Sequence, residues 1–354
     1  MDSDAGLQDL RPDWEALAQA DPRATVFQQP AMVLMLRQVF HPGRSPFIAT
    51  VRNTAGQLQA LLPLGLTHRR LGPAPMRTLS PLTGWHAASP DPLLRPDSDD
   101  HAVKNLLSGL YEVDRWDLLE CRGIAAGGVF ARAAIECAAS VSHVGVSQSV
   151  PLAPGELVMS AGHRRELRRL LRRLSETTPT TIDDIGDDRE RRMTALQAFA
   201  RLHQQRWERT ATPSPLARRA IRTRFVECLA APRGIDCRLI CLEADAEIVG
   251  VLIVFRDRGV DHAWRLAFDG RFAHVSPGLQ LLTRGMELAA AAGQSRFDLG
   301  RGDDRYKATW RTERSELVGV RWCRPSRRVR VVRSIGRTVG RPWIAAWESS
   351  GGSA

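Results

Sequence analysis

The chain has very little lysine and tyrosine for its length. Of its 354 residues, 50 are lysine or arginine, yet the only lysines are Lys104 and Lys307, and the only tyrosines are Tyr111 and Tyr306. One lysine and one tyrosine therefore stand side by side at 306–307. A compact ammonium recognises ligands differently from a planar guanidinium, so a lysine retained here indicates a specific need, with chance placement as the alternative.

Other absences remove whole classes of protein. The six cysteines form no CxxC pair and the nine histidines no HxxxH spacing, so neither a disulfide framework nor a metal site is expected. No run of about 18 apolar residues is present, so no membrane-spanning helix is expected. The acidic start Met1-Asp2-Ser3-Asp4 lacks the apolar segment of a secretory signal. We therefore expect a cytoplasmic protein.

Positive charge is what the chain has in excess. Its formal net charge is +11 at pH 7, and arginines gather at 164–173 and again at 324–341. Such a field favours anionic ligands, namely the phosphates of a cofactor, a nucleotide, an RNA or an acidic lipid surface. A length of 354 residues exceeds one ordinary core and predicts two domains.

The order of the expected elements divides the chain into two α/β domains with mixed sheets. The first, over residues 1–150, has a helix, a hairpin at 47–66, a strand, a helix, a strand and a helix. The second, over residues 155–323, has helices at 193–207 and 216–229, three meandering strands, a further helix and a final strand. Residues 324–354 form a basic tail that is loosely ordered or leans on anionic lipid.

The stretch from Ser276 to Trp310 organises the second domain. Ser276 suits an N-cap, Pro277 the first helical position and Gly293 the position just after the helix. A strand at 296–299 follows and ends in a charged loop flanked by glycines. A strand, a capped helix, a strand and a polar loop in this order are typical of a ligand site at the carboxyl ends of strands.

A family resemblance rests on these residues. The motifs are Ser276-Pro277-Gly278, then Phe297-Asp298-Leu299-Gly300-Arg301-Gly302-Asp303, Tyr306-Lys307 with Trp310, and the arginine-rich helix from Arg164 to Arg173. With them the second domain resembles GNAT acyltransferases, and more closely the CelD-type acetyltransferases associated with polysaccharide biosynthesis. These are relatives of the FemAB peptidyltransferases. The resemblance implies two tandem GNAT-like domains and acetyl-CoA or another acyl-CoA as co-substrate, without a metal.

The resemblance also implies where the acyl donor binds. It enters where the strand 261–268 and the strand 296–299 splay apart, and the helix that follows Pro277 aims its N–H groups at the donor's phosphates. The implied donor-binding residues are Ser276, Gly278, Leu279, Gln280 and Trp264. Ordinary GNAT enzymes carry Gln/Arg-x-x-Gly-x-Gly/Ala before this helix, whereas this chain has only Gly278. An aminoacyl-tRNA donor, as FemAB relatives use, therefore stays open.

Several side chains are candidates for the chemistry. Lys307 is expected to stabilise negative charge or hold a donor phosphate, and Tyr306 to donate a proton or form a wall of the site. Asp298, Asp303 or His262 is expected to act as the base or orient the nucleophile. Arg301, Trp310, Arg164 and Arg168 complete the expected substrate-binding set. The plainer alternatives are a turn role for the two aspartates, pairing of Asp298 with Arg301, and a structural role for His262.

Three functions follow. The first is an acyl-CoA-dependent N- or O-acyltransferase that acts on a glycan precursor, a sugar nucleotide or another small acceptor. The second is a FemAB-like transferase that uses aminoacyl-tRNA, whose RNA backbone the basic helix and tail contact. The third is a non-catalytic basic adaptor for nucleic acid or membrane. It ranks last because the sequence has no recognised nucleic-acid motif.

Overall fold

The chain divides into two compact units. The computed structural model describes residues 4–71, 74–98, 100–152, 159–208, 210, 213–326 and 328–330. Unit 1 comprises residues 1–145 and 316–354, and unit 2 comprises residues 146–315. The expected domains, 1–150 and 155–323, differ from this division at 146–150, which pair with a strand of unit 2, and at 316–323, which pair with a strand of unit 1. Most of the basic tail predicted at 324–354 lies outside the described residues.

Unit 1 is built on a mixed sheet. Its strand order is β1 (Ser45–Arg52), β2 (Leu58–Leu71), β3 (Ala74–Pro81), β5 (Leu118–Ala125) and β12 (Glu313–Cys323), with β4 (Leu93–Leu94) beside β2. The pair β3–β5 is parallel, and the other neighbours along this order are antiparallel. The predicted hairpin at 47–66 is confirmed, because β1 and β2 pair from Ser45↔Leu66 to Arg52↔Leu58.

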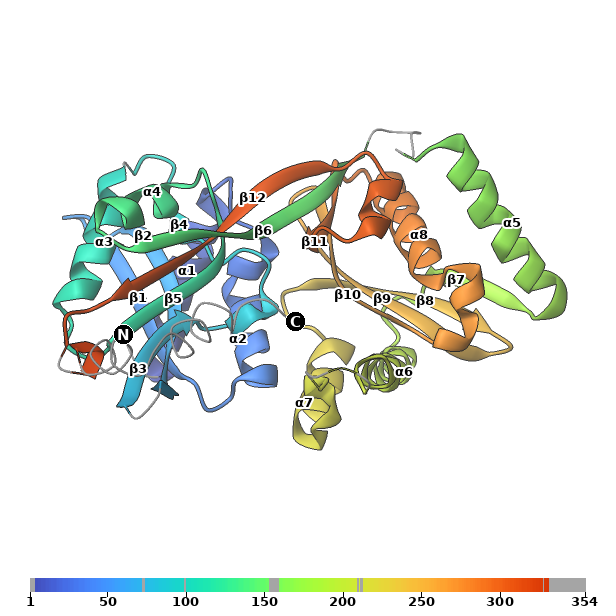
Figure 1. Ribbon diagram of the computed structural model, residues 1–354, viewed down its shortest axis with the longest axis horizontal. Coiled ribbons are helices and arrows are strands. Elements are labelled where there is room, and N and C mark those ends of the chain that lie inside the picture. The colour runs from blue at the N-terminus through green and yellow to red at the C-terminus, as the bar shows by residue number, and fades with distance from the viewer. Residues whose placement is uncertain are drawn as a thin grey trace. The chain divides into compact units, whose positions relative to one another are not determined.

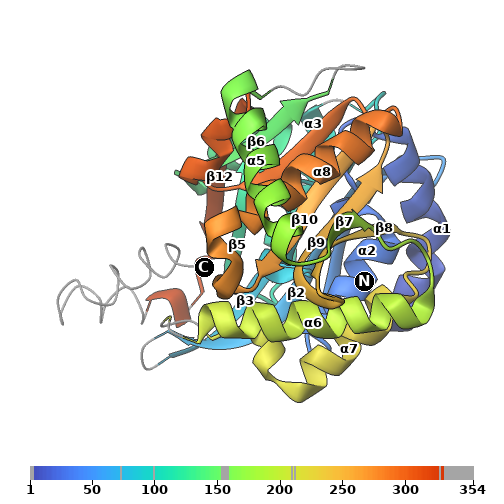
Figure 2. The ribbon, with the colours of Figure 1, turned by 90° about the vertical axis from the view of Figure 1, so that its right-hand side faces the viewer.

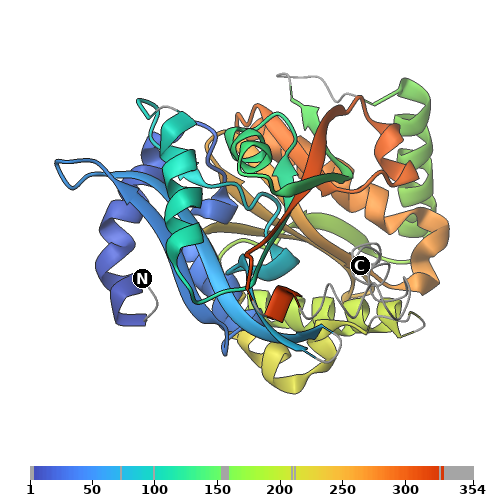
Figure 3. The same cartoon turned by 60° about the vertical axis from the view of Figure 1, so that its left-hand side comes forward.

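Helices cover both faces of this sheet. Alternate side chains of β1 face opposite ways, as a strand requires. Ile48 packs with α1 (Asp4–Ala20) and α2 (Pro30–Phe40). Phe47 and Ala49 pack with α3 (Asp100–Glu112) and α4 (Val129–Glu136). Figure 1 labels the four helices, and Figure 3 shows the blue and teal helices on either side of the blue strands.

Unit 2 repeats the same architecture. Its strand order is β6 (Ser140–Pro151), β11 (Arg296–Arg301), β10 (Val260–Phe268), β9 (Glu247–Asp257), β8 (Asp236–Ala244) and β7 (Thr180–Asp184). Here β10–β11 is the parallel pair, joined by α8 (Pro277–Ala291). The pairs β6–β11, β9–β10, β8–β9 and β7–β8 are antiparallel.

Unit 2 also has one helical layer on each face of its sheet. The helix α8 packs on Ile240, Leu252 and Val254 in one core cluster. The helix α6 (Arg189–Trp207) contacts α7 (Arg219–Ala230) and lies on β9 and β10 on the other face. Figure 2 shows α6 and α7 below the strands and α8 above them, with α5 (Ala161–Thr177) beside α8. These layers set which strand residues face which helix.

The element order confirms the expected tandem GNAT-like α/β fold. In each unit two helices precede three meandering strands, a helix, and a strand parallel to the third. The last strand of each unit's sheet comes from the neighbouring part of the chain. Strand β6 follows the elements of unit 1 and pairs with β11 of unit 2, whereas β12 follows the elements of unit 2 and pairs with β5 of unit 1. The sequence patterns did not predict β7 or β12. Both are rich in charged residues, which masks the alternation of a half-buried strand.

Within the described ranges, no helix is both long and apolar enough to cross a membrane. The cysteines are free thiols, and Cys121, Cys237 and Cys241 are buried as small apolar residues, which the sequence had indicated.

Candidate active site

The parallel strands β10 and β11 part near the middle of unit 2. They pair at Val260↔Arg296, Asp261↔Phe297 and His262↔Asp298, and no further pair joins them, although β10 runs on to Phe268. A bulge between Ala263 and Arg265 disturbs the register of β10 with β9 at the same level. The expected splaying of these strands is therefore confirmed. Beyond this last pair, the carbonyls of Gly300 and Arg301 accept from Lys307 instead of from β10.

A histidine–aspartate pair stands where the strands part. The Nδ1 atom of His262 lies 2.9 Å from Oδ2 of Asp298, and the other carboxylate oxygen accepts the Gly300 N–H at 2.8 Å. His262 is 6% exposed. A carboxylate that accepts from Nδ1–H selects the tautomer in which Nε2 carries the lone pair. The plainer pairing of Asp298 with Arg301 is not what the structure shows.

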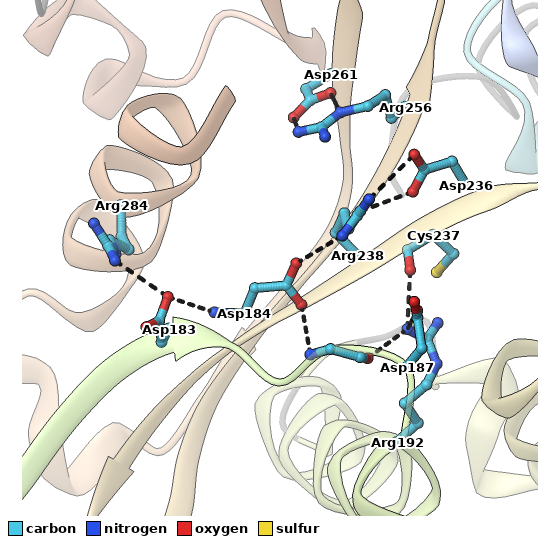
Figure 4. Close-up of polar contacts among 11 residues, drawn as sticks. Asp183, Asp184, Asp187, Arg192, Asp236, Cys237, Arg238, Arg256, Asp261 and Arg284 are labelled. Atoms are coloured by element: carbon cyan, nitrogen blue, oxygen red, sulfur yellow. Dashed lines mark hydrogen bonds and ion pairs between the residues drawn. The ribbon is translucent and has the colours of Figure 1, made fainter. Parts of the chain in front are cut away.

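The electrostatics of the pair favour an ionised aspartate. Burial raises the pKa of Asp298, but the hydrogen bond and charge of His262, the Gly300 N–H and the Lys307 ammonium together lower it below its ordinary value of 3.8. The start of β10 is fixed beside this pair, because Arg256 binds Asp261 through two hydrogen bonds of 2.7 and 2.8 Å (Figure 4). The carboxylate can thus hold the imidazole in one orientation.

Lys307 is buried and holds the loop that follows β11. Its Nζ donates to the carbonyl oxygens of Gly300, Arg301 and Gly302 at 2.8, 2.8 and 3.0 Å, which uses all three donors of an ammonium. The side chain is 1% exposed. Burial lowers the pKa of this ammonium, against the opposing effect of Asp304, Asp298 and Asp303. The structure gives Lys307 a positioning role that the sequence analysis did not foresee.

Two glycines allow the carbonyls to converge on Lys307. Gly300 and Gly302 have φ of +71° and +101°, a region that glycine enters at no steric cost. Gln148 on β6 adds a second clamp, since its Nε2 donates to the Gly302 carbonyl and to Oδ1 of Asp303, both at 3.1 Å. Sequence reasoning missed Gln148, which lies more than 150 positions away in the chain.

The remaining catalytic candidates lie at the rim of this loop. Asp303 pairs with Arg314 at 2.7 Å, so its carboxylate is already engaged in an ion pair. Tyr306 is 39% exposed. Burial and the charge of Asp304 raise the pKa of its phenol to about 12, with Arg206 acting in the opposite sense. Tyr306 is therefore a protonated hydroxyl at neutral pH, suited to donate a hydrogen bond.

The two tryptophans of the sequence prediction have different surroundings. Trp310 is 3% exposed and sits in the core cluster with Met159, 6.5 Å from Tyr306 between ring centroids. Trp264 lies at the bulge of β10, where Arg265 stands 4.7 Å over its ring. Trp264 thus lies just beyond the last β10–β11 pair, whereas Trp310 packs inside the core behind the loop.

The expected donor-binding turn leads into α8. Ser276 occupies the N-cap position in the left-handed region, with φ of +53°, and its side chain makes no cap hydrogen bond. Gly278 packs on β10, where an added Cβ would lie 3.2 Å from Leu266. The Gln280 amide donates at 2.8 Å to the carbonyl of Leu167, and Leu279 is partly buried on the core. Of the predicted set, Gln280 is already engaged within the protein.

The Leu167–Gln280 hydrogen bond ties α5 to the start of α8. Leu167 and Leu174 are buried, while the arginines of α5 lie on its outer faces. Arg164 is half-buried and Arg168 exposed. The predicted substrate-binding arginines are therefore carried by a helix that contacts the start of α8, but neither forms a hydrogen bond or ion pair with the His262–Asp298 pair.

A basic group at the end of α6 was not predicted. Burial, followed by the charges of Arg265 and Arg206, lowers the pKa of His203 to about 4. Arg206 also acts on Tyr306, and burial lowers the pKa of Arg265 to about 10. No local signal could have placed these residues together, because α6 ends at Trp207 and β10 begins only at Val260.

His203 leads to a pH prediction. Its folded pKa is depressed, so between pH 4 and 6.5 the unfolded chain binds a proton that the folded chain excludes, and the free energy of unfolding falls as pH drops through that window. At pH 5 this loss is about 2 kcal/mol relative to pH 7.5. In His203→Gln the loss should shrink by that amount, measured by urea unfolding at both pH values. An unchanged pH dependence would contradict the assignment.

Comparison with known proteins agrees with this geometry. Residues 161–308 match the model of the acetyltransferase (GNAT) domain. That range contains the parted strands, the His262–Asp298 pair and Lys307, so the similarity to the acetyltransferase (GNAT) domain falls on the part of unit 2 that holds the candidate site. No curated protein sequence matches this chain.

Solved structures share the fold over nearly the whole chain. FemX has 13% identity and a TM-score of 0.63, covering 93% of this chain and 98% of FemX. The C-terminal domain of a putative lysylphosphatidylglycerol synthetase from Agrobacterium fabrum has 11% identity and a TM-score of 0.57, covering 95% and 97%. L-PGS from Bacillus licheniformis has 12% identity and a TM-score of 0.53, covering 96% and 98%. At these identities the likeness is one of fold.

Proposed function

We propose that the protein transfers an acyl group from acyl-CoA to an amine or hydroxyl of a small acceptor, with a glycan precursor as the acceptor class. The observation that carries the proposal is the parting of β10 and β11 directly after His262 and Asp298. Unpaired backbone groups of parted strands can bond the amide arm of the donor. The same opening brings the acyl carbonyl to the imidazole.

Four residues have distinct roles in this proposed reaction. His262 accepts a proton at Nε2 from the acceptor's nucleophile as that nucleophile attacks the carbonyl carbon, and the bond to the thiolate leaving group breaks. Asp298 keeps the imidazole oriented and stabilises its charged form. Lys307 holds the loop that orients Asp298, while Tyr306 offers a hydroxyl to the departing sulfur.

Two matched glycine substitutions test whether the acyl donor binds where β10 and β11 part. Gly300→Ala strains the backbone at φ +71° beside the Ala263 carbonyl, and Gly56→Ala strains a hairpin of unit 1 at φ +80°. Both should lose about 1 kcal/mol of stability. Only Gly300→Ala is expected to weaken acetyl-CoA binding, measured by calorimetry, and product formation, measured by mass spectrometry on an amine and hydroxyl panel. Equal effects of both substitutions, or no binding by the wild type, would refute the proposal.

Aminoacyl-tRNA is the second candidate donor. The turn before α8 has one glycine and a proline where GNAT enzymes present a glycine-rich phosphate loop, and α5 exposes arginines toward solvent. The fold likeness to FemX is compatible with this donor. Native mass spectrometry of the purified protein distinguishes the two, because copurified CoA and copurified tRNA differ greatly in mass.

A further inference from the structure

A pocket lies in unit 2 at the opposite end of α6 from the basic group near Tyr306. It has a volume of about 560 Å³ and is bounded by the start of α6, the segment that joins α7 to β8, and the first residues of β8. Because α6 has 19 residues, its two ends are about 28 Å apart. The pairing Cys237↔Phe255↔His262 places the β8 side of the pocket two strands from the His262–Asp298 pair, about 10 Å at the usual strand spacing.

Most of the pocket's polar lining is charged. Four arginines line it, Arg189, Arg192, Arg233 and Arg238, together with Asp187 and Asp236. Arg238 is already neutralised, by Asp236 at 2.8 Å and Asp184 at 3.4 Å (Figure 4). Arg189 and Arg233 are exposed, and neither forms an ion pair with a described residue. Four positive and two negative side chains leave the lining with a net charge of +2.

Arg192 adds a buried positive charge to the wall of the pocket. It is 1% exposed and donates to the carbonyls of Gly186, Cys237 and Leu229 at 3.0–3.1 Å, while its Nε has no hydrogen-bond partner. Its carboxylate neighbour, Asp187, lies 3.7 Å away with 92% of the side chain exposed, so water screens that pair (Figure 4).

No other anion compensates the guanidinium within the lining. Burial raises the pKa of the Cys237 thiol to about 12, which keeps the thiol neutral. Carbonyl dipoles satisfy the Arg192 donors but do not cancel the charge. A buried cation with a solvated counter-charge favours an additional anion nearby.

We infer that this pocket binds a compact oxyanion with two or more negative charges, a diphosphate or a polycarboxylate. Arginine forks match the oxygens of phosphate and carboxylate groups, and the exposed Arg189 and Arg233 are placed to supply them. The volume is in the range of small-molecule sites. No aromatic ring lines the pocket, so it offers no platform on which a nucleobase would stack.

Calorimetry on the full chain tests the site with pyrophosphate and citrate, at about 0.15 M NaCl to screen general surface charge. The pocket variant is Arg189→Ala/Arg233→Ala, and the matched control is Arg70→Ala/Arg219→Ala, which removes two exposed arginines elsewhere. The wild type and the control should bind alike. The pocket variant should bind at least about tenfold more weakly, because two charge-assisted contacts are lost.

The outcomes separate a built site from general attraction. Preferential binding of pyrophosphate identifies a phosphorylated ligand, and preferential binding of citrate a polycarboxylate. Equal weakening of both double variants, or no measurable binding of either anion to the wild type, overturns the inference. All four arginines of the test are exposed, so unchanged melting temperatures should confirm folding. The readout is independent of acyl transfer.

Discussion

Replacing Lys307 with methionine is expected to lower the free energy of unfolding by about 3–5 kcal/mol and the transfer rate by about 100-fold. The ammonium donates to three carbonyls in a buried position, and methionine keeps the stem but leaves those carbonyls without donors. The loop would then relax, and the Gly300 N–H would no longer orient Asp298. Urea unfolding and steady-state kinetics measure the two effects.

The other lysine of the chain provides the control. Lys104 is partly exposed and pairs with Glu136 at 2.7 Å on the surface of unit 1, so Lys104→Met should change stability by no more than about 1 kcal/mol. In Lys307→Ala, ammonium ions are expected to restore part of the rate, whereas choline chloride at equal ionic strength should not. Wild-type rates in Lys307→Met would show that the loop holds without its central cation.

Removing the imidazole at position 262 is expected to have the largest effect on catalysis. His262→Ala should lower kcat by about 10²–10⁴-fold, the usual contribution of a positioned base, with a smaller change in KM for the acyl donor. Asp298→Asn should lower kcat by about tenfold or more, because the amide no longer supports the charged imidazole. His143→Ala, an exposed histidine of unit 1, should leave kcat unchanged.

The lowered pKa of Asp298 means that its carboxylate stays ionised over the pH range in which these variants are compared with the wild type. Its folded pKa is depressed, so the carboxylate stays ionised above pH 4, and its contribution to stability is lost only as pH falls below its ordinary value of 3.8. Ionisation of Asp298 itself should therefore contribute no pH dependence to kcat between pH 6 and 9. A kcat for His262→Ala within twofold of the wild type would remove His262 from the mechanism.

Local patterns predicted a large part of the fold. Pro277 and Gly293 bound the helix α8 as expected, and Gly293 takes the positive φ of +74° that the position after a helix requires. The hairpin β1–β2 follows from alternation around a turn at Asn53 and Gly56. These signals lie within one turn or one strand pair, so the sequence carries them without tertiary information. Ser276 shows the limit, since it occupies the N-cap without capping through its side chain.

The sequence by itself determined the two-unit α/β plan, the caps of α8 and the residue types that cluster after β11. Tertiary structure alone decided that His262 meets Asp298 across two strands, that Lys307 closes on three carbonyls, and that Gln148 reaches the same loop. It also decided that β12 pairs in unit 1. The physical reason is that these contacts depend on strand register and packing between segments far apart in the chain, which helical and strand periodicities do not encode.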